Sequence, residues 1–427
     1  MVEVKNKTGK GPYFKRLIFV LMLVQMVDSF TTVMPGAIVS AIANTFLPGI
    51  PTNEQDSIYA FGTAIISIGM CFLFISQYLS DKIGRKKMLI ITVFGMSFAA
   101  VGMFFSTSFV MYMIFLFIMS FFFSSDIWLI YINEEAEPNK RAYYSNIILI
   151  AGLIGPIFMI ISRLIFISDV NPYWQGMTFF PIILGFPLCF IIYFTLKETK
   201  KYEEMKGSGT IKKRSFKEDL TAIFNTENRK PYMILLVIVF IRGMSGIFLG
   251  LFEKYLANVR LTNPGAVSQG GVTIIFLLTI FAVFIAYAMN GLLADKIGRK
   301  PLLYLWCCLT PISVIIWVFG AHHPTSAFLI VLLGYSMSHI SVWGAIGVIR
   351  LTTIELLPTD RRGTGVGFRS LISSIGAIIG LLLSSAVILV LGLGPTFLIF
   401  VMGNFIVIPI AYFFLKETKG VELSEIK

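Results

Sequence analysis

Charged side chains are scarce in this chain. Asp, Glu, Lys and Arg make up 14% of its 427 residues, and 56% are hydrophobic. Because a soluble domain carries about 25% charged residues, this composition excludes an ordinary water-soluble fold. Long apolar runs recur instead, and each is long enough to cross a ~30 Å hydrocarbon core. No water satisfies exposed backbone groups there, so each run predicts a helix.

Several kinds of functional site are also missing. The four cysteines lie in apolar runs and no two have metal-ligand spacing, so we interpret them as packing residues and expect no metal site. No P-loop is present, so we expect no nucleotide cofactor and a proton gradient as the energy source. No triad-like constellation is present either, so the chain is not expected to be an enzyme. Residues 1–16 are polar and basic, and the apolar run after them is too long for a signal peptide.

Twelve apolar runs predict twelve transmembrane helices, and hence an all-α integral membrane fold. The predicted spans are 17–43, 58–80, 87–105, 109–132, 143–167, 176–196, 231–255, 272–294, 301–320, 326–352, 364–391 and 394–415.

The net charge of +12 is distributed unevenly. With a cytoplasmic N-terminus, the predicted inner segments hold 29 of the 35 Lys and Arg residues, and the outer loops hold two, Lys254 and Arg260. This bias follows the positive-inside rule. It predicts a multi-pass protein of the cell membrane with both termini in the cytoplasm, whose basic residues contact anionic lipid and not nucleic acid.

Short strings repeat at a nearly constant distance. Asp-Lys-Ile-Gly-Arg-Lys occurs at Asp81–Lys86 and again 214 residues later at Asp295–Lys300. Glu-x-x-Pro, at 135 and 355, and Lys-Glu-Thr-Lys, at 197 and 416, recur after 220 and 219 residues. The repeats predict two pseudo-symmetric six-helix bundles, 1–196 and 231–427, joined by a cytoplasmic linker, 197–230. Parallel repeats of this kind place a binding site between the halves, near the bilayer midplane.

These strings resemble the signatures of the major facilitator superfamily. The duplicated string is similar to its loops between helices 2–3 and 8–9, Glu355–Gly363 to the loop after helix 10, and Leu415–Gly420 to the sugar-porter ending. The resemblance covers the whole chain and extends to the sugar porter and organic solute:proton symporter branches. It implies the major facilitator fold, alternating access, and a monomer that carries a small molecule across the lipid bilayer. Gln77 stands where the first signature usually begins with glycine, and the paired glutamines of sugar contact are missing.

The repeated loops predict a cytoplasmic latch. Glycine permits the tight turn between two antiparallel helices, and acidic residues can pair with the flanking cations and with a helix N-terminus. In the family such loops act as a conformational latch, and the alternative is a static orientation signal. The predicted latch residues are Asp81, Gly84, Arg85, Glu135, Arg141, Asp295, Gly298, Arg299, Glu355 and Arg362.

Two charges lie deep within predicted spans. Asp28 is near the middle of the first span, and Arg242, 214 residues later, has the equivalent position in the seventh. A charge at mid-span costs at least ~2.5–3.5 kcal/mol, so each needs a partner or a wet cavity. Gln25 and Thr32 share a helical face with Asp28, and Ser245 shares one with Arg242. We predict that both faces line a central cavity.

Three roles are open for this pair. In the first, Arg242 binds an anionic group of the substrate in a forked geometry, and Asp28 carries the coupling proton. The resemblance supports this role, because related families carry a proton-binding Asp in helix 1. In the second, the two charges form a fixed ion pair. In the third, Asp28 binds a cationic or polyhydroxy substrate and Arg242 tunes it.

Other candidates lie on further spans. Tyr335, His339 and Trp343 share one face of the tenth span, which suits either a cavity wall or ordinary packing. Asp126 and Arg369 lie near the inner ends of the fourth and eleventh spans. They form a possible intramembrane pair, and the alternative for Asp126 is a second proton site.

The predicted function is secondary active transport of a small organic solute by alternating access. We expect a proton-coupled symporter that prefers an organic anion or a related metabolite. The alternatives are proton-antiport efflux of drug-like or waste compounds, sugar uptake, and a membrane sensor that transports nothing. Inhibition by one narrow solute class would indicate a symporter. Transport of many lipophilic compounds would indicate an exporter, and absence of flux would indicate a sensor.

Overall fold

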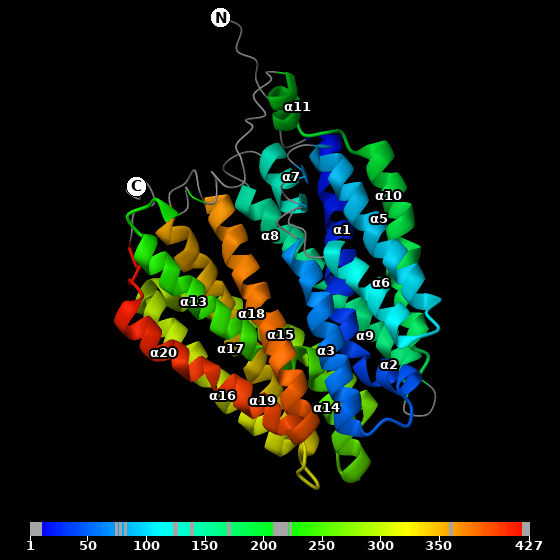
Figure 1. Cartoon of the computed structure of the whole chain (residues 1–427). Coiled ribbons are helices and arrows are strands. Elements are labelled where there is room, and N and C mark those ends of the chain that lie inside the picture. The colour runs from blue at the N-terminus through cyan, green and yellow to red at the C-terminus, as the bar shows by residue number, and fades with distance from the viewer. Residues whose placement is uncertain are drawn as a thin grey trace, which may run out of the picture. The chain divides into compact units, whose positions relative to one another are not determined.

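A computed structural model of the chain is helical, with connecting turns, in the residues that it describes (Figure 1). These are residues 11–72, 76, 79–80, 83–122, 127–136, 141–168, 172–207, 221, 224–357 and 362–420. Within them, 11 helical segments are long and apolar enough to cross a membrane. The remaining predicted span, 58–80, begins inside α3 (Thr52–Cys71) and continues into residues outside the described part. The all-α membrane fold predicted from the apolar runs is confirmed.

The contacts between residues divide the chain into two compact units, of which the first comprises residues 1–35, 72–167 and 171–213. Its central helix is α5, which packs against α6 and α10. The last two residues of α1 fall in the second unit. The elements of the first unit are α1 (Pro12–Ala37), α5 (Arg85–Phe104), α6 (Phe109–Phe122), α7 (Ile127–Glu135), α8 (Arg141–Gly152), α9 (Ile154–Phe166), η2 (Trp174–Thr178), α10 (Phe179–Thr195) and α11 (Lys200–Gly207).

The second unit comprises residues 36–71, 168–170 and 214–427. Among its long helices, α16 packs on α17 and α13 packs on α18; Figure 1 shows α13 beside α18. Its helices are α2 (Val39–Phe46), α3, α13 (Arg229–Ser245), α14 (Ile247–Thr262), α15 (Gln269–Ile297), α16 (Arg299–Gly320), α17 (Ala327–Leu356), α18 (Arg362–Leu391), α19 (Leu393–Val401) and α20 (Gly403–Phe414).

The second unit is larger than the predicted C-terminal half, because residues 36–71 belong to it. These residues come from the first two predicted spans. Within the unit, α3 packs along α18 and α2 packs on α14. Hydrogen bonds support this packing, and the Ser57 hydroxyl donates to the backbone carbonyl of Ser385 at 2.7 Å. The division into halves at residues 197–230 stays a prediction from the repeats.

Glycines allow α13 and α18 to approach closely. A Cβ atom added to Gly376 would lie 2.3 Å from the Phe240 carbonyl oxygen, and one added to Gly243 would lie 2.4 Å from the Ser373 carbonyl oxygen. Such contacts are typical of membrane helices, which associate through small residues. They hold α13, the helix that carries Arg242, firmly against α18.

Candidate functional site

We call the end of each unit that carries Gly84 or Gly298 its loop end. At the loop end of the first unit, Arg85 donates to Glu134 Oε1 through Nε at 3.3 Å and Nη2 at 3.0 Å. Its Nη1 donates to the Ser80 carbonyl at 3.0 Å, and the Thr199 hydroxyl donates to Glu134 Oε2 at 2.6 Å. The Arg85 and Glu134 side chains are 4% and 8% exposed, so this ion pair is shielded from water.

The second unit repeats this network at its own loop end. Arg299 donates to Glu355 through Nε at 3.1 Å and Nη2 at 2.6 Å, and through Nη1 to the Ala294 carbonyl at 2.9 Å. The Thr418 hydroxyl donates to Glu355 Oε2 at 2.5 Å. The sequence repeat therefore corresponds to a repeat of the same polar bonds, each set complete within one unit.

A glutamate caps the helix that begins at each loop end. Glu198 accepts from the backbone N–H groups of Arg85 at 2.9 Å and Lys86 at 3.2 Å. Glu417 accepts from the equivalent groups of residues 299 and 300, both at 2.9 Å. These N–H groups have no partner within a helix, so a carboxylate satisfies them and interacts favourably with the helix dipole.

The glycine before each capped helix makes room for the glutamate. Gly84 and Gly298 have φ of 104° and 98°, a conformation that side chains disfavour. A Cβ atom on Gly298 would also lie 2.8 Å from Glu417 Oε2. Burial raises the pKa of Glu417, but hydrogen bonds from the backbone of residues 299–300 and 418–419 outweigh it and leave that pKa below its ordinary value.

The glutamate that pairs with Arg85 is the neighbour of a predicted latch residue. Glu134, and not Glu135, is the partner of Arg85, while Glu135 accepts from the Lys200 backbone at 3.1 Å. One residue of helix turns a side chain by about 100°, so neighbouring positions face different partners. Asp295 pairs with Arg299 Nη1 at 2.9 Å.

Three predicted latch residues cannot be placed in these networks. Asp81 lies outside the described residues, and so do the side chains of Arg141 and Arg362, whose backbones begin α8 and α18. Their roles stay predictions.

Asp28 lies within α1 in a buried polar stretch and is 8% exposed. The hydroxyls of Thr31 and Thr32 donate to its backbone carbonyl at 2.9 and 2.8 Å. One turn earlier, Gln25 donates through Nε2 to Ser29 at 3.2 Å. The buried Oε1 atom of Gln25 has no hydrogen-bond partner in the described part of the chain. This stretch therefore offers an uncommitted acceptor close to a buried carboxyl group.

Arg242 is anchored by one nitrogen. Nη1 donates to Asn404 Oδ1 on α20 at 2.7 Å and to Cys307 Sγ on α16 at 3.4 Å. Among the residues that the structure describes, no partner is found for Nε or Nη2. Ser245, predicted on the same face, donates to the Ile241 carbonyl at 2.8 Å. The guanidinium is thus fixed in place through Nη1, while the three N–H donors of Nε and Nη2 stay available in the described part of the chain.

The predicted residues of the tenth span lie on α17 and make packing contacts. Tyr335 is 2% exposed, and its ring stacks on Phe252 with centroids 3.5 Å apart. The Nδ1 atom of His339 lies 3.2 Å from the Tyr335 carbonyl oxygen. Trp343 packs 6.4 Å from Tyr287, measured between ring centroids. These contacts agree with the packing alternative.

Two predicted pairings of charges stay predictions. Asp126 lies outside the described residues, and Arg369 donates to the Ser370 hydroxyl at 3.2 Å. Asp28 belongs to the first unit and Arg242 to the second.

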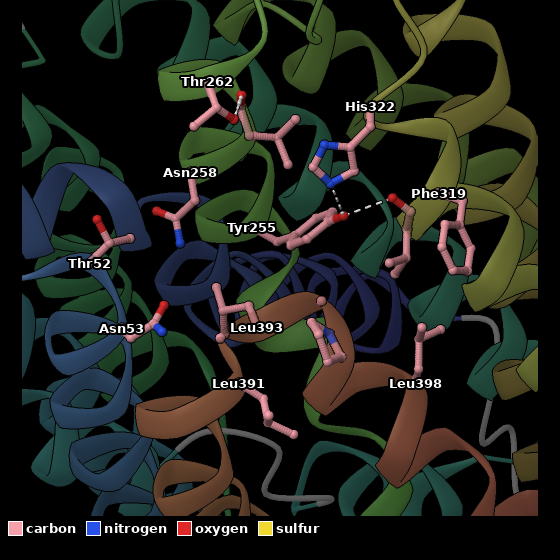
Figure 2. A pocket seen from close by; sticks show the side chains of 15 residues that line it. Thr52, Asn53, Tyr255, Asn258, Thr262, Phe319, His322, Leu391, Leu393 and Leu398 are labelled. Carbon is pink, nitrogen blue, oxygen red and sulfur yellow. Dashed lines mark hydrogen bonds between the residues drawn. The ribbon is translucent and has the colours of Figure 1, made fainter.

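A cavity of about 390 Å³ opens at the end of the second unit opposite its loop end, which we call the far end. Figure 2 shows Asn53 and Asn258 on one side of it and Tyr255 with His322 on the other. The Tyr255 hydroxyl donates to the Val318 carbonyl at 2.7 Å and lies 3.1 Å from His322 Nε2. Amide donors and acceptors therefore face an otherwise largely apolar hollow.

Comparison with known proteins decides the class of this chain. The family model of the Major Facilitator Superfamily matches residues 21–349 and 265–426. The chain belongs to the Major Facilitator Superfamily. It is therefore a multi-pass membrane transporter of small organic solutes, and not an enzyme.

Similar superfamily members are known by sequence and by structure. The putative niacin/nicotinamide transporter NiaP of Bacillus subtilis is 26% identical over 366 residues, 84% of this chain and 87% of the relative. The putative metabolite transport protein YwtG of the same organism is 25% identical over 82% of this chain and 81% of its own. The inward-open structure of the xylose transporter XylE from E. coli matches with a TM-score of 0.75 and 16% identity, over 97% of this chain and 98% of that chain. The last likeness shows the major facilitator fold alone.

Several residues of this chain that form hydrogen bonds or ion pairs were not predicted as functional from the sequence. Glu198 and Glu417 lie in the repeated Lys-Glu-Thr-Lys strings, which signalled them without indicating a role. Lys254 was predicted to lie in an outer loop, but it is 3% exposed, and Glu253 beside it is 0% exposed. The reason is that residues of α2 and α3 cover them, and hydropathy along one segment cannot reveal such a cover.

Proposed function

We propose that this transporter is a proton-coupled symporter of the cell membrane that takes up a small organic anion. A monocyclic aromatic carboxylate such as nicotinate is the first candidate. Arg242 binds the carboxylate, and Asp28 carries the proton.

The observation that carries the proposal is that the guanidinium of Arg242 is held through Nη1 alone in the described part of the chain. Asn404 holds Nη1 at 2.7 Å, and in the described part of the chain Nε and Nη2 have no partner. Nε and one terminal nitrogen form the fork that matches the two oxygens of a carboxylate. A guanidinium inside a membrane bundle is costly unless it is paired, so it favours an anionic occupant.

The relatives support the size and class of the solute. One is named a niacin/nicotinamide transporter, and another, 26% identical over 54% of this chain, a probable 4-methylmuconolactone transporter from Cupriavidus pinatubonensis. Both names denote small cyclic organic compounds. Nicotinate and nicotinamide differ in charge at the same ring position, so the two together test the role of Arg242.

Asp28 is the proposed proton carrier because it is a buried carboxyl group in a membrane helix. Carboxyl groups in such positions commonly serve proton relays in transporters. The free Oε1 of Gln25 can accept a hydrogen bond from a solute or from a water molecule one helical turn away.

Uptake into proteoliposomes tests this function. With an imposed pH gradient, labelled nicotinate should accumulate, and Arg242→Lys, which keeps the charge but loses the fork, should raise the KM for nicotinate about ten-fold. Arg350→Lys is the matched control, because Arg350 is an exposed arginine on α17. An unchanged KM in Arg242→Lys contradicts the binding role, and accumulation of xylose in place of nicotinate favours sugar uptake.

A further inference from the structure

A buried ion pair lies at the far end of the second unit. Lys254 Nζ is 3.5 Å from Asp56 Oδ1, and the two side chains are 4% and 1% exposed. Gln55 Oε1 accepts a hydrogen bond from Lys254, and Asn258 donates to Asp56 Oδ2 at 2.5 Å. We call these four residues the far-end cluster.

The cluster joins helices from different parts of the chain. Gln55 and Asp56 lie in the first turns of α3, just before the second predicted span. Lys254 and Asn258 lie on α14, which follows α13 and contains the end of the seventh predicted span. The Nε2 atom of Gln55 also donates to the Leu47 carbonyl at 2.9 Å. This bond joins α3 to the residue that follows α2.

Three further hydrogen bonds join α2 to α14 and α3 to α18 beside the cluster. Glu253, beside Lys254, accepts from the backbone N–H of Ser40 at 2.7 Å and from its hydroxyl. Ser57, beside Asp56, donates to the Ser385 carbonyl on α18 at 2.7 Å. The ends of the first two spans are thus bound to the seventh and eleventh spans by charged and neutral hydrogen bonds that are shielded from water.

A cavity lies beside this buried cluster. Asn258 is a member of the cluster and also lines the 390 Å³ cavity, together with Thr52 and Asn53 from the start of α3 (Figure 2). Movement of α3 away from α14 would open the cavity onto the ion pair. Two separated charges are well solvated in water, but each is poorly solvated when it stays buried without its partner.

We propose that the far-end cluster is the gate latch on this side of the transporter. Asp56 and Lys254 hold α3 against α14 while the far end is closed, and they separate into water when it opens. The latch assigns a role to four residues outside the loop-end networks. It rests on the proposed transport function, because only a transporter that alternates must open this contact.

Thiol labelling without any solute tests the latch separately from transport. Ser385→Cys places a thiol of similar size at the α3–α18 contact, where Ser385 is 7% exposed. Labelling by N-ethylmaleimide at this site is followed by peptide mass spectrometry, which separates it from the four native cysteines. The reporter alone should react slowly.

Breaking the pair should expose the reporter. Lys254→Met and Asp56→Asn each leave one charge buried, so each should speed labelling about five-fold or more, and the double variant should speed it less. Asn258→Leu, which removes the hydrogen bond from the side-chain amide to Asp56 and leaves both charges in place, is the milder variant and should act in the same direction. Ser338→Ala, which removes a buried hydrogen bond between α17 and α16, is the control and should leave the rate unchanged.

Two results would overturn the latch. One is a labelling rate within two-fold of the reporter in all three single variants. The other is equal acceleration by Ser338→Ala, which would indicate general loosening. Loss of nicotinate uptake in proteoliposomes changes neither result, so failure of the proposed function is distinguishable from failure of the latch.

Discussion

Arg299 holds Glu355 through two nitrogens, with Nε at 3.1 Å and Nη2 at 2.6 Å from the carboxylate. The two residues come from the start of α16 and the end of α17, so the pair ties two helices together at the loop end. Arg85 and Glu134 form the equivalent pair in the first unit. The ion pairs of the duplicated loops therefore join helices within each unit.

The first prediction compares the contributions of two neighbouring glutamates to stability. Glu134→Ala should lower the stability of the protein by about 3 kcal/mol, because it breaks the buried ion pair with Arg85. Glu135→Ala should change it by less than about 1 kcal/mol, because in the described part of the chain Glu135 accepts a hydrogen bond from the Lys200 backbone and has no ion pair. Thermal unfolding in detergent measures both, and a larger loss in Glu135→Ala would contradict the observed pairing.

The second prediction concerns the Glu417 cap and pH. Its pKa is lowered in the folded protein, so its carboxylate stabilises the fold above the ordinary pKa of 4.5, and this contribution is lost as the pH falls through the lowered value. Glu417→Gln should therefore lower Tm at pH 7 and have a smaller effect near pH 4. An equal loss of Tm at both pH values would show that the charge is unimportant.

A third prediction uses two glycines on neighbouring helices. Gly376→Ala should destabilise the protein by about 1–3 kcal/mol, because the new Cβ atom would meet the Phe240 carbonyl. Gly250→Ala is the matched control, since nothing lies within 4 Å of its added Cβ atom. Comparison of Tm for the two variants checks the close contact of α13 and α18, and equal effects would refute it.

The anchor of Arg242 yields a fourth prediction. Asn404→Ala removes the bond at 2.7 Å and frees the guanidinium to rotate. The KM for nicotinate should rise about five-fold with little change in maximal rate, because a less ordered group binds more weakly. Thr396→Ala on α19, which loses only a bond within its own helix turn, should leave KM unchanged. Equal KM values in all three chains would show that Asn404 does not position Arg242.

The sequence predicted the helical spans and the repeat well, because both depend on local patterns. Apolar runs identified α15 and α16 within a few residues, and the duplicated string identified Arg85 and Arg299 as equivalent. The sequence did not single out Glu134 as the partner of Arg85, because the Glu-x-x-Pro spacing does not report helix phase. The pairing of Asp56 with Lys254, 198 positions apart, depends on the packing of α3 against α14, which no pattern along the chain encodes.

Uphill uptake by Asp28→Asn most directly tests the central claim that a proton on Asp28 drives carboxylate transport. Proteoliposomes with an imposed pH gradient are compared for net accumulation and for exchange of labelled nicotinate. The parent chain should accumulate nicotinate above equilibrium, and Asp28→Asn should lose accumulation but keep exchange. Accumulation by Asp28→Asn equal to that of the parent would contradict the account.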